Sequence, residues 1–147
     1  MTIRIVSIAA LLAAGTLFAA APAYAEVINM MAELNGPSEV PPTDSAGTGM
    51  VEATFDTDSK AFAWTATYEG LTGDATAAHF HGPAEVGANA KPSVPIEGSL
   101  ASPIKGTATL TDEQAKQLQA GTWYFNVHTA KFPDGEIRGQ VIAAGAM

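Results

Sequence analysis

From residue 26 onward the sequence predicts an all-β fold, an antiparallel Greek-key β-sandwich with one short helix. Apolar and polar residues alternate in roughly seven or eight short runs, which is the period of half-buried strands. Glycine, proline, asparagine and aspartate separate these runs at intervals of roughly 8–15 residues, as in sandwich folds. Only one segment combines a cap, an acidic start and a glycine stop, the features of a helix.

Turn chemistry places the boundaries of the first strands. Asn35-Gly36-Pro37 ends the first run, and the polar spacer Asp56-Thr57-Asp58-Ser59 joins the second and third runs as a hairpin. In the third run Phe62 and Trp64 share one face, the pattern of a half-buried strand. Gly82-Pro83 ends the fourth run and opens a loop rich in glycine and proline. The strands expected in this half cover residues 27–34, 49–55, 61–68 and 75–81.

A short helix interrupts the strands of the second half. Thr111 is expected to cap it, Gln114 to complete a capping box, and two acids lie in the positive first turn. Gly121 is expected to end it. Pro133-Asp134-Gly135 is a turn that joins the last two strands. The expected elements are strands at residues 93–100, 105–110, 123–129 and 136–143 and a helix at residues 112–119.

Residues 1–25 are predicted to be a secretory signal peptide. Arg4 gives a positive start, residues 5–21 are apolar, and Ala23-Tyr24-Ala25 fits the small-x-small cleavage pattern. The competing interpretation is a retained membrane anchor, but an apolar stretch of about 17 residues is short of the roughly 20 that a spanning helix needs. We therefore expect one mature domain over residues 26–147, without a membrane span, in the periplasm or the medium.

Charge and cysteine content exclude several classes of function. Without Arg4, six basic residues face 15 acidic ones, a balance of about −9 that repels nucleic acid. The absence of cysteine excludes thiolate nucleophiles, iron–sulfur clusters, cysteine-based zinc sites and blue copper sites. No nucleophile elbow with a Ser-His-Asp set and no glycine-rich phosphate loop is present in the sequence.

Three histidines form the candidate site. His79 and His81 are two apart in an expected strand, so they point to one face while Phe80 points to the other. His128 lies in another alternating run, which an adjacent strand could bring alongside. Neutral imidazole is a frequent ligand of copper and zinc, and the all-nitrogen set in an exported protein favours one copper ion. The other interpretation is a set of hydrogen-bonded histidines on a polar strand face.

Neighbouring residues could orient these ligands. Asn126 shares the face of the third histidine, and Glu136 or Arg138 could approach from the next strand. Glu136 and Arg138 have two further interpretations, a surface ion pair, which is preferred, and a charged rim that guides a small anion to the metal. Met30 and Met31 could offer a thioether to cuprous ion, at most one of them at a given site, and core packing is the preferred interpretation.

Four segments, in this order, resemble the chordin-like domain family, called CHRD. They are LNGPSEVPP at 34–42, HFHGPA at 79–84, GTWYFNVHT at 121–129 and PDGEIRGQ at 133–140. The resemblance extends over about residues 30–142. It implies an all-β domain, and many bacterial members are short exported single-domain proteins. It implies little about activity.

A second similarity is architectural and concerns copper-zinc superoxide dismutases. These are also Greek-key sandwiches, and they hold copper with a His-x-His pair on one strand and further histidines elsewhere. The sandwich expected for this chain is accordingly immunoglobulin-like or superoxide-dismutase-like. The chain has only three histidines and no cysteine. It therefore lacks the fourth copper histidine and the bridging histidine, and no zinc site of the dismutase type is expected.

Two functions follow from these features. The first is an exported copper-binding protein that holds the ion at His79, His81 and His128, or cycles it as a copper-dependent superoxide dismutase. The alternative is a non-catalytic extracellular module that binds a protein or a glycan. The sequence leaves open whether the chain is an enzyme, and it indicates no particular protein partner.

Overall fold

The computed structural model describes residues 25–145, which form eight strands and one α-helix. The predicted signal peptide lies outside this range except for Ala25. Over residues 25–145 no helix has the length and apolar character needed to cross a membrane. The strands are β1 (Val27–Asn35), β2 (Thr48–Asp56), β3 (Ala61–Glu69), β4 (Ala75–His81), β5 (Pro92–Pro95), β6 (Ile104–Thr109), β7 (Trp123–Thr129) and β8 (Ile137–Ala143).

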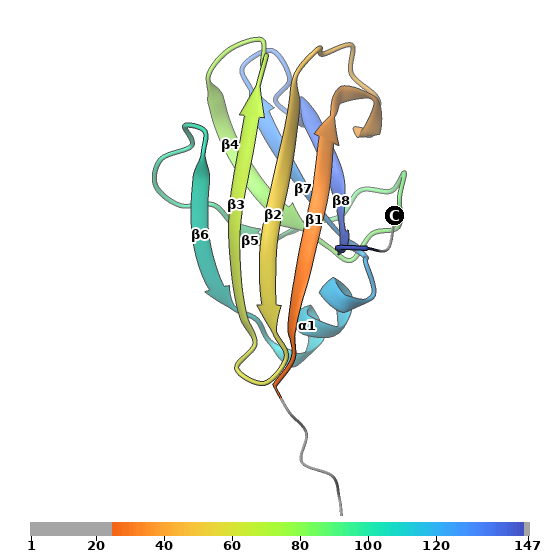
Figure 1. Ribbon diagram of the computed structural model, residues 1–147. Coiled ribbons are helices and arrows are strands. Elements are labelled where there is room, and N and C mark those ends of the chain that lie inside the picture. Colours follow the sequence, from red (N-terminus) through yellow and green to blue (C-terminus); the bar gives the residue numbers. More distant parts are fainter. Residues whose placement is uncertain (1–24, 146–147) are drawn as a thin grey trace, which may run out of the picture.

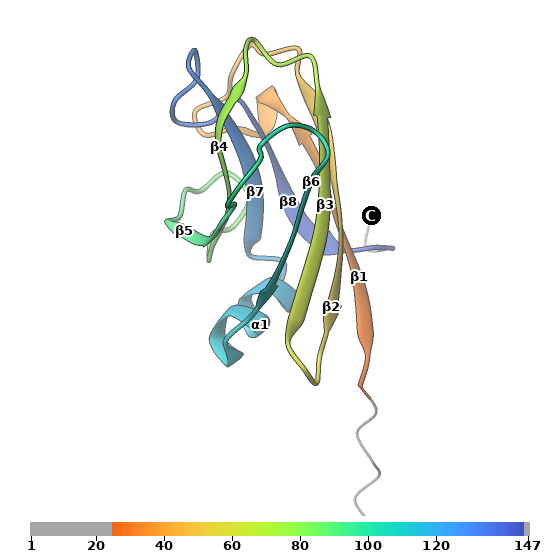
Figure 2. The same cartoon turned by 90° about the vertical axis from the view of Figure 1, so that its left-hand side faces the viewer.

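The strands form one antiparallel sheet in the order β5-β4-β7-β8-β1-β2-β3-β6. The sheet folds over on itself, so that β1, β2, β3 and β6 make one layer and β5, β4, β7 and β8 the other (Figures 1 and 2). The connections β3–β4, β5–β6 and β6–β7 pass between the layers, as in Greek-key folds. The prediction of an all-β sandwich is confirmed.

Alternating apolar residues fill the space between the layers. Phe80 of β4 packs against Phe62 and Trp64 of β3, with ring centroids 5.1 Å apart in each case and edge-to-face geometry. Phe125 of β7 pairs with Phe80 across the two strands, and their ring centroids are 4.8 Å apart. Each fully buried aromatic ring contributes roughly 2–3 kcal/mol through apolar area removed from water. This core fixes which residues of β4 and β7 point outward.

The helix α1 (Asp112–Gln119) has the expected bounds and the expected capping box. Thr111 accepts a hydrogen bond from the backbone of Gln114, and the Gln114 side chain accepts one from the backbone of Thr111. Gly121 follows the helix with a φ of 71°, the left-handed conformation in which helices commonly stop. Leu118 is the fully buried residue of the helix, so a short helix closes one end of the sandwich.

Two local features differ from the sequence-based expectations. β5 has four residues instead of the expected eight, with proline at both of its ends, and proline cannot donate to a strand ladder. A short 3-10 helix, η1 (Gly36–Ser38), follows β1 where only a break was expected. The Asn35 side chain caps it by accepting a hydrogen bond from the Ser38 nitrogen at 2.9 Å.

Candidate metal site

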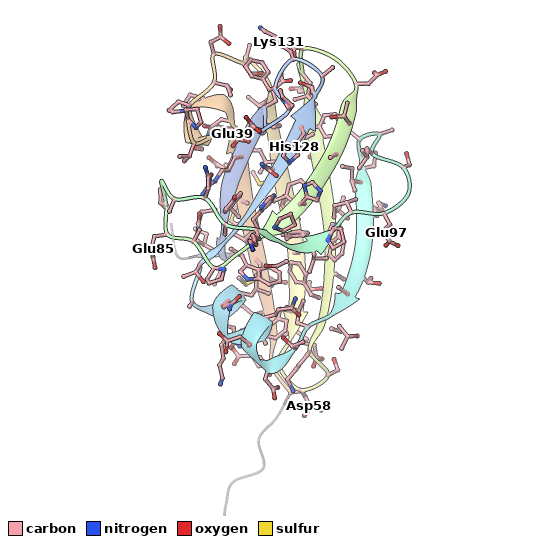
Figure 3. The ribbon with its side chains drawn as sticks, turned by 180° about the vertical axis from the view of Figure 1, so that it is seen from behind. Glu39, Asp58, Glu85, Glu97, His128 and Lys131 are labelled. Carbon is pink, nitrogen blue, oxygen red and sulfur yellow. The ribbon has the colours of Figure 1, made fainter. Side chains whose placement is uncertain are left out.

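The three histidines lie together on the outer face of β4 and β7. These strands are antiparallel neighbours whose register pairs His79 with Asn126, so His128 is a diagonal neighbour of His79. The alternation that turns Phe80 into the core turns His79 and His81 outward. Figure 3 views this face of the molecule, with His128 on β7. The predicted clustering of three imidazoles is present.

The distances between the ring nitrogens suit one small cation. Nδ1 of His79 lies 3.2 Å from Nε2 of His128, a hydrogen bond in the protein without metal, and ligand atoms from all three rings lie within 4.8 Å of one another. Metal–nitrogen bonds of about 2.0–2.1 Å at a tetrahedral angle place two nitrogens about 3.3 Å apart. One pair is already at that spacing, and His81 would have to approach by at most about 1.5 Å.

Backbone carbonyls fix the protonation of two of the rings. Nδ1 of His81 lies 2.9 Å from the Ala90 oxygen, and Nδ1 of His128 lies 2.9 Å from the Pro133 oxygen. A carbonyl oxygen can only accept, so both Nδ1 atoms carry a proton and donate it. In the neutral ring Nε2 then keeps its lone pair, which is the form that binds a metal ion. Nε2 of His81 is buried and has no hydrogen-bond partner.

Burial favours the neutral form of His79 and of His81. His81 and His128 are 7% and 9% exposed, and His79 is half-buried. Burial lowers the pKa of His79, and the proximity of His128 and His81 lowers it further. Burial also lowers the pKa of His81, against the hydrogen bond to Ala90, which raises it. His79 and His81 are therefore neutral near neutral pH and can offer lone pairs to a cation.

Residues 82–91, between β4 and β5, cover this face. The segment turns at Gly82, where a Cβ atom would overlap the indole ring of Trp123, so only glycine fits. The Gln140 side chain donates to the Ala84 carbonyl at 2.9 Å and holds the start of the segment. Figure 3 shows the segment crossing in front of β7 and β8. Every residue of β7 is consequently buried, the outward-facing ones included.

Arg138 lies beneath this segment and not at an exposed rim. It is 2% exposed, and its guanidinium donates to Oδ1 of Asn89 at 3.0 Å and to the Ala88 carbonyl at 2.6 Å. It lies 3.4 Å from the centroid of the Tyr124 ring, on which His81 stacks with centroids 4.7 Å apart. The interpretation of Arg138 as part of a charged rim that guides anions is therefore wrong. Its connection to the histidines runs through Tyr124 and the covering segment.

Glu136 is fully buried as well, so the preferred interpretation of Glu136 and Arg138 as a surface ion pair is also wrong. The Glu136 carboxylate accepts hydrogen bonds from Ser45 Oγ at 2.6 Å, from Thr72 N and Oγ1 at 2.8 Å each, and from Thr129 Oγ1 at 2.5 Å. Burial alone would raise the pKa of Glu136, but these hydrogen bonds together lower it. No histidine is among these partners, so the carboxylate ties two loops to the end of β7.

Glu39 is a buried carboxyl near the histidines that the sequence did not single out. It is 4% exposed, and Figure 3 shows it in the same region of the molecule as His128. Burial raises the pKa of Glu39 to about 7, against the opposing effect of the Arg138 charge. Its signal in the sequence is that it is the one charged residue of the segment LNGPSEVPP.

Asn126 lies between Glu39 and the histidines. A Cβ atom at Gly135, which has a φ of 130°, would overlap both the Glu39 carboxyl and the Asn126 amide, so only glycine allows their approach. Four buried side-chain nitrogen or oxygen atoms in residues 25–145 have no hydrogen-bond partner, and three of them are Oδ1 of Asn126, Oε1 of Glu39 and Nε2 of His81. Buried polar atoms are ordinarily paired, so their concentration here marks a candidate binding site.

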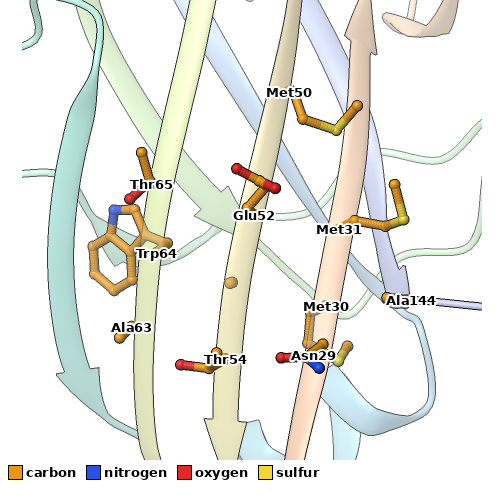
Figure 4. Close-up of a pocket in the computed structure, with 11 residues that line it drawn as sticks. Asn29, Met30, Met31, Met50, Glu52, Thr54, Ala63, Trp64, Thr65 and Ala144 are labelled. Atoms are coloured by element: carbon orange, nitrogen blue, oxygen red, sulfur yellow. The ribbon is translucent and has the colours of Figure 1, made fainter.

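The methionines considered as thioether ligands lie elsewhere. Met30 is 3% exposed and packs in the core, as preferred from the sequence. Met31 and Met50 line a hollow of about 560 Å³ on the outer face of β1, β2 and β3 (Figure 4). That face belongs to the other layer of the sandwich. Neither Met30 nor Met31 therefore joins the histidines.

The fold and the site together define the class of protein, which is an all-β sandwich with a histidine cluster on the buried polar face of one layer. The family model of the CHRD domain matches residues 30–141 of the chain. The chain therefore belongs to the CHRD domain family, as its motifs predicted. No curated protein matches the chain, and no solved structure does.

Proposed function

We propose that the protein binds one copper ion through His79, His81 and His128. The observation that carries this proposal is the pair of Nδ1–H donations to Ala90 and Pro133, which leaves Nε2 of His81 and of His128 without a proton, in rings whose ligand atoms lie within 4.8 Å of one another. Without metal the Nε2 lone pair of His128 accepts a hydrogen bond from His79, which a bound ion would replace. Histidine ligands of metals ordinarily donate their other nitrogen to such an acceptor. Burial alone would not require two carbonyls to select the same tautomer.

Copper is the proposed ion for two reasons. Cupric ion binds a given set of nitrogen ligands more tightly than the other divalent first-row ions, zinc included. A structural zinc site ordinarily has four protein ligands, and this chain has only three histidines, so the cluster does not match a closed structural zinc site. Three ligands leave one position for a small molecule. His79 is half-buried while its two partners are buried, so access to that position is on the His79 side.

A dismutase-type redox activity is the extension of this proposal. Its support is that three histidine ligands would leave one coordination position of the ion open to a small molecule. Two features weaken the case for dismutase activity. Both hydrogen bonds of the Arg138 guanidinium are made within the protein, so it is not available to attract an anion, and the acidic surface repels superoxide. Pulse radiolysis on the copper-loaded protein tests this activity by measuring the rate of superoxide removal. A rate equal to that of the His79→Ala, His81→Ala double variant would mean that the protein binds copper but is not a dismutase.

Copper binding itself is tested by metal analysis and electron paramagnetic resonance. The protein should take up one cupric ion with several nitrogen donors, and the triple variant His79→Ala, His81→Ala, His128→Ala should lose it. Met31→Leu is the matched control, because it removes a thioether from the hollow on the opposite layer and should leave binding unchanged. Equal copper affinity in the triple variant would refute the site and leave the alternative, a non-catalytic binding module for a protein or glycan.

We also propose that the protein acts in the periplasm or outside the cell after cleavage at Ala25. The support is the order of charge, apolar run and small-x-small pattern in residues 1–25. Intact-mass measurement on protein from its native host should give a chain that starts at Glu26 or within a residue or two of it. A chain that retains Met1 would contradict the proposal.

A further inference from the structure

We infer that Arg138 is a positioning residue for the metal site. It holds residues 88–90 in place so that the Ala90 carbonyl keeps the His81 ring oriented and protonated on Nδ1. The consequence for copper rests on the proposed function. The tautomer of the His81 ring is a property of the protein without metal, so the positioning of His81 and the binding of copper can be tested separately.

The first step is the anchoring of the covering segment. The guanidinium of Arg138 makes two hydrogen bonds, to Asn89 and to Ala88, immediately before the residue that bonds His81. The ion pair found within residues 25–145 is Lys60–Asp112, so Arg138 has no carboxylate partner within 4.0 Å. A buried charge is costly unless its hydrogen bonds are satisfied. The contacts with residues 88 and 89, the Tyr124 ring and the charge of Glu39 together compensate for burying this guanidinium.

The second step is the Tyr124 ring, which connects Arg138 with His81 directly. β4 and β8 flank β7 on opposite sides, so Tyr124 lies between the imidazole of His81 and the guanidinium of Arg138. The two aromatic rings are nearly parallel, at 5°. The Tyr124 hydroxyl lies 3.2 Å from the Ala90 nitrogen and 3.3 Å from its oxygen. One side of the His81 ring is thus stacked, and its Nδ1 edge is held by the same residue that Tyr124 contacts.

Geometry makes arginine specific for this role. Its planar fork reaches two acceptors while its face lies on an aromatic ring, a combination that a lysine ammonium does not offer. Gln140 is the natural comparison, because it lies on the same strand and binds the same covering segment at Ala84, six residues before Ala90. Loss of Gln140 would loosen the start of the segment and leave the contacts beside His81 in place.

The experiment is long-range proton–nitrogen NMR of the histidine rings in the metal-free protein, above the histidine pKa. The parent should show His81 with the proton on Nδ1. Arg138→Gln should show averaging between the two tautomers, whereas Gln140→Leu should keep the parental signals. Arg138→Lys retains the charge and serves as the second variant if Arg138→Gln does not fold. It should also show averaging, because one ammonium cannot replace both contacts.

The copper affinity of the same variants supplies the second readout. Arg138→Gln should weaken copper binding by about 10–100-fold, the usual cost of losing a contact that orients a metal ligand, and Gln140→Leu by less than about 3-fold. Unchanged His81 signals in folded Arg138→Gln or Arg138→Lys would overturn the inference, whatever the parent does with copper. Averaged signals in a protein that binds no copper would sustain the positioning of His81 and refute the proposed function.

Discussion

Glu136 and Glu39 are both buried carboxyl groups at the polar side of the β7–β8 layer, but their surroundings differ. Glu136 accepts four hydrogen bonds from three residues, and its pKa is lowered. Oε1 of Glu39 has no hydrogen-bond partner of good geometry, and burial raises the pKa of this carboxyl to about 7, against the charge of Arg138 and weaker contributions from the Val40 backbone and the Asn126 side chain. A satisfied buried carboxylate stabilises the fold, whereas an unsatisfied one costs free energy. On one layer of the sandwich, Glu136 therefore marks a region that stabilises the fold, and Glu39 marks the candidate site.

The same contrast extends to the neighbours of the two groups. The partners of Glu136 are hydroxyls and one backbone nitrogen that belong to loops and to the end of β7. The neighbours of Glu39 include Asn126, whose Oδ1 is also unpaired, and the histidine site with the unpaired Nε2 of His81. Unsatisfied buried groups are tolerated where a ligand or a reaction uses them. We therefore expect substitutions at Glu136 to change stability and substitutions near Glu39 to change binding.

The largest effect is expected from Glu136→Gln. An amide cannot accept from all of the present donors and adds two donors of its own, so several buried polar groups lose their partners. Urea unfolding should show a loss of about 3 kcal/mol in the free energy of unfolding. The exposed Glu33→Gln on β1 is the control and should change stability by less than about 0.5 kcal/mol.

Copper binding in folded Glu136→Gln should match that of the parent, because no histidine contacts this carboxylate. If Glu136→Gln lowered the free energy of unfolding by less than about 1 kcal/mol, Glu136 would not be the carboxyl that stabilises the fold, and the contrast with Glu39 would fail. A loss of copper affinity larger than that of Arg138→Gln would place Glu136 in the metal site instead.

The second effect is stabilisation by copper. A ligand that binds only the folded state at 100 times its dissociation constant adds about 2.7 kcal/mol to the free energy of unfolding. The parent should gain this amount on addition of cupric ion, and His81→Ala should gain much less. Thermal or urea unfolding with and without metal measures it. Equal stabilisation of both proteins would show that the ion binds away from the unpaired Nε2 of His81.

The sequence predicts the strands and the helix well, but it does not predict which polar side chains of the outer face are buried. Periodicity and turn residues predicted most elements to within about a residue, because the alternation that defines β4 or β7 is local. The same alternation predicted that His79 and His81 share a face. It also gave the correct parity for Asn126, which pairs with His79 across the two strands.

The features that were missed depend on the path of a loop. Outward-facing positions of a strand are normally solvated, so the sequence predicts exposed charges at Glu136 and Arg138. Residues 82–91 and the loop that contains Glu39 bury this face instead, and no local pattern encodes where such a loop returns. Tyr124, which stacks on His81, was missed for the same reason. A polar residue on a strand face is exposed only if nothing covers that face.

The smallest of these effects is expected at Glu39 and depends on pH. The pKa of Glu39 is about 7 in the folded protein, against 4.5 for a glutamate that is exposed to solvent. A carboxyl whose folded pKa is raised favours folding while it stays protonated, so its contribution is complete below pH 4.5. As the pH rises from 4.5 to 7, the unfolded chain ionises first, and the free energy of unfolding falls by an amount on the order of 2 kcal/mol.

Glu39→Gln removes this titration and keeps the shape of the side chain. The variant should show a flatter stability profile between pH 4.5 and 7 than the parent and should be the more stable of the two above pH 7. Glu52→Gln, an exposed acid on β2, is the control that should leave the profile unchanged. Parallel urea titrations across this range measure the difference. A profile for Glu39→Gln as steep as that of the parent would mean that Glu39 is as well satisfied as Glu136, and the contrast between the two carboxyls would no longer distinguish the site from the scaffold.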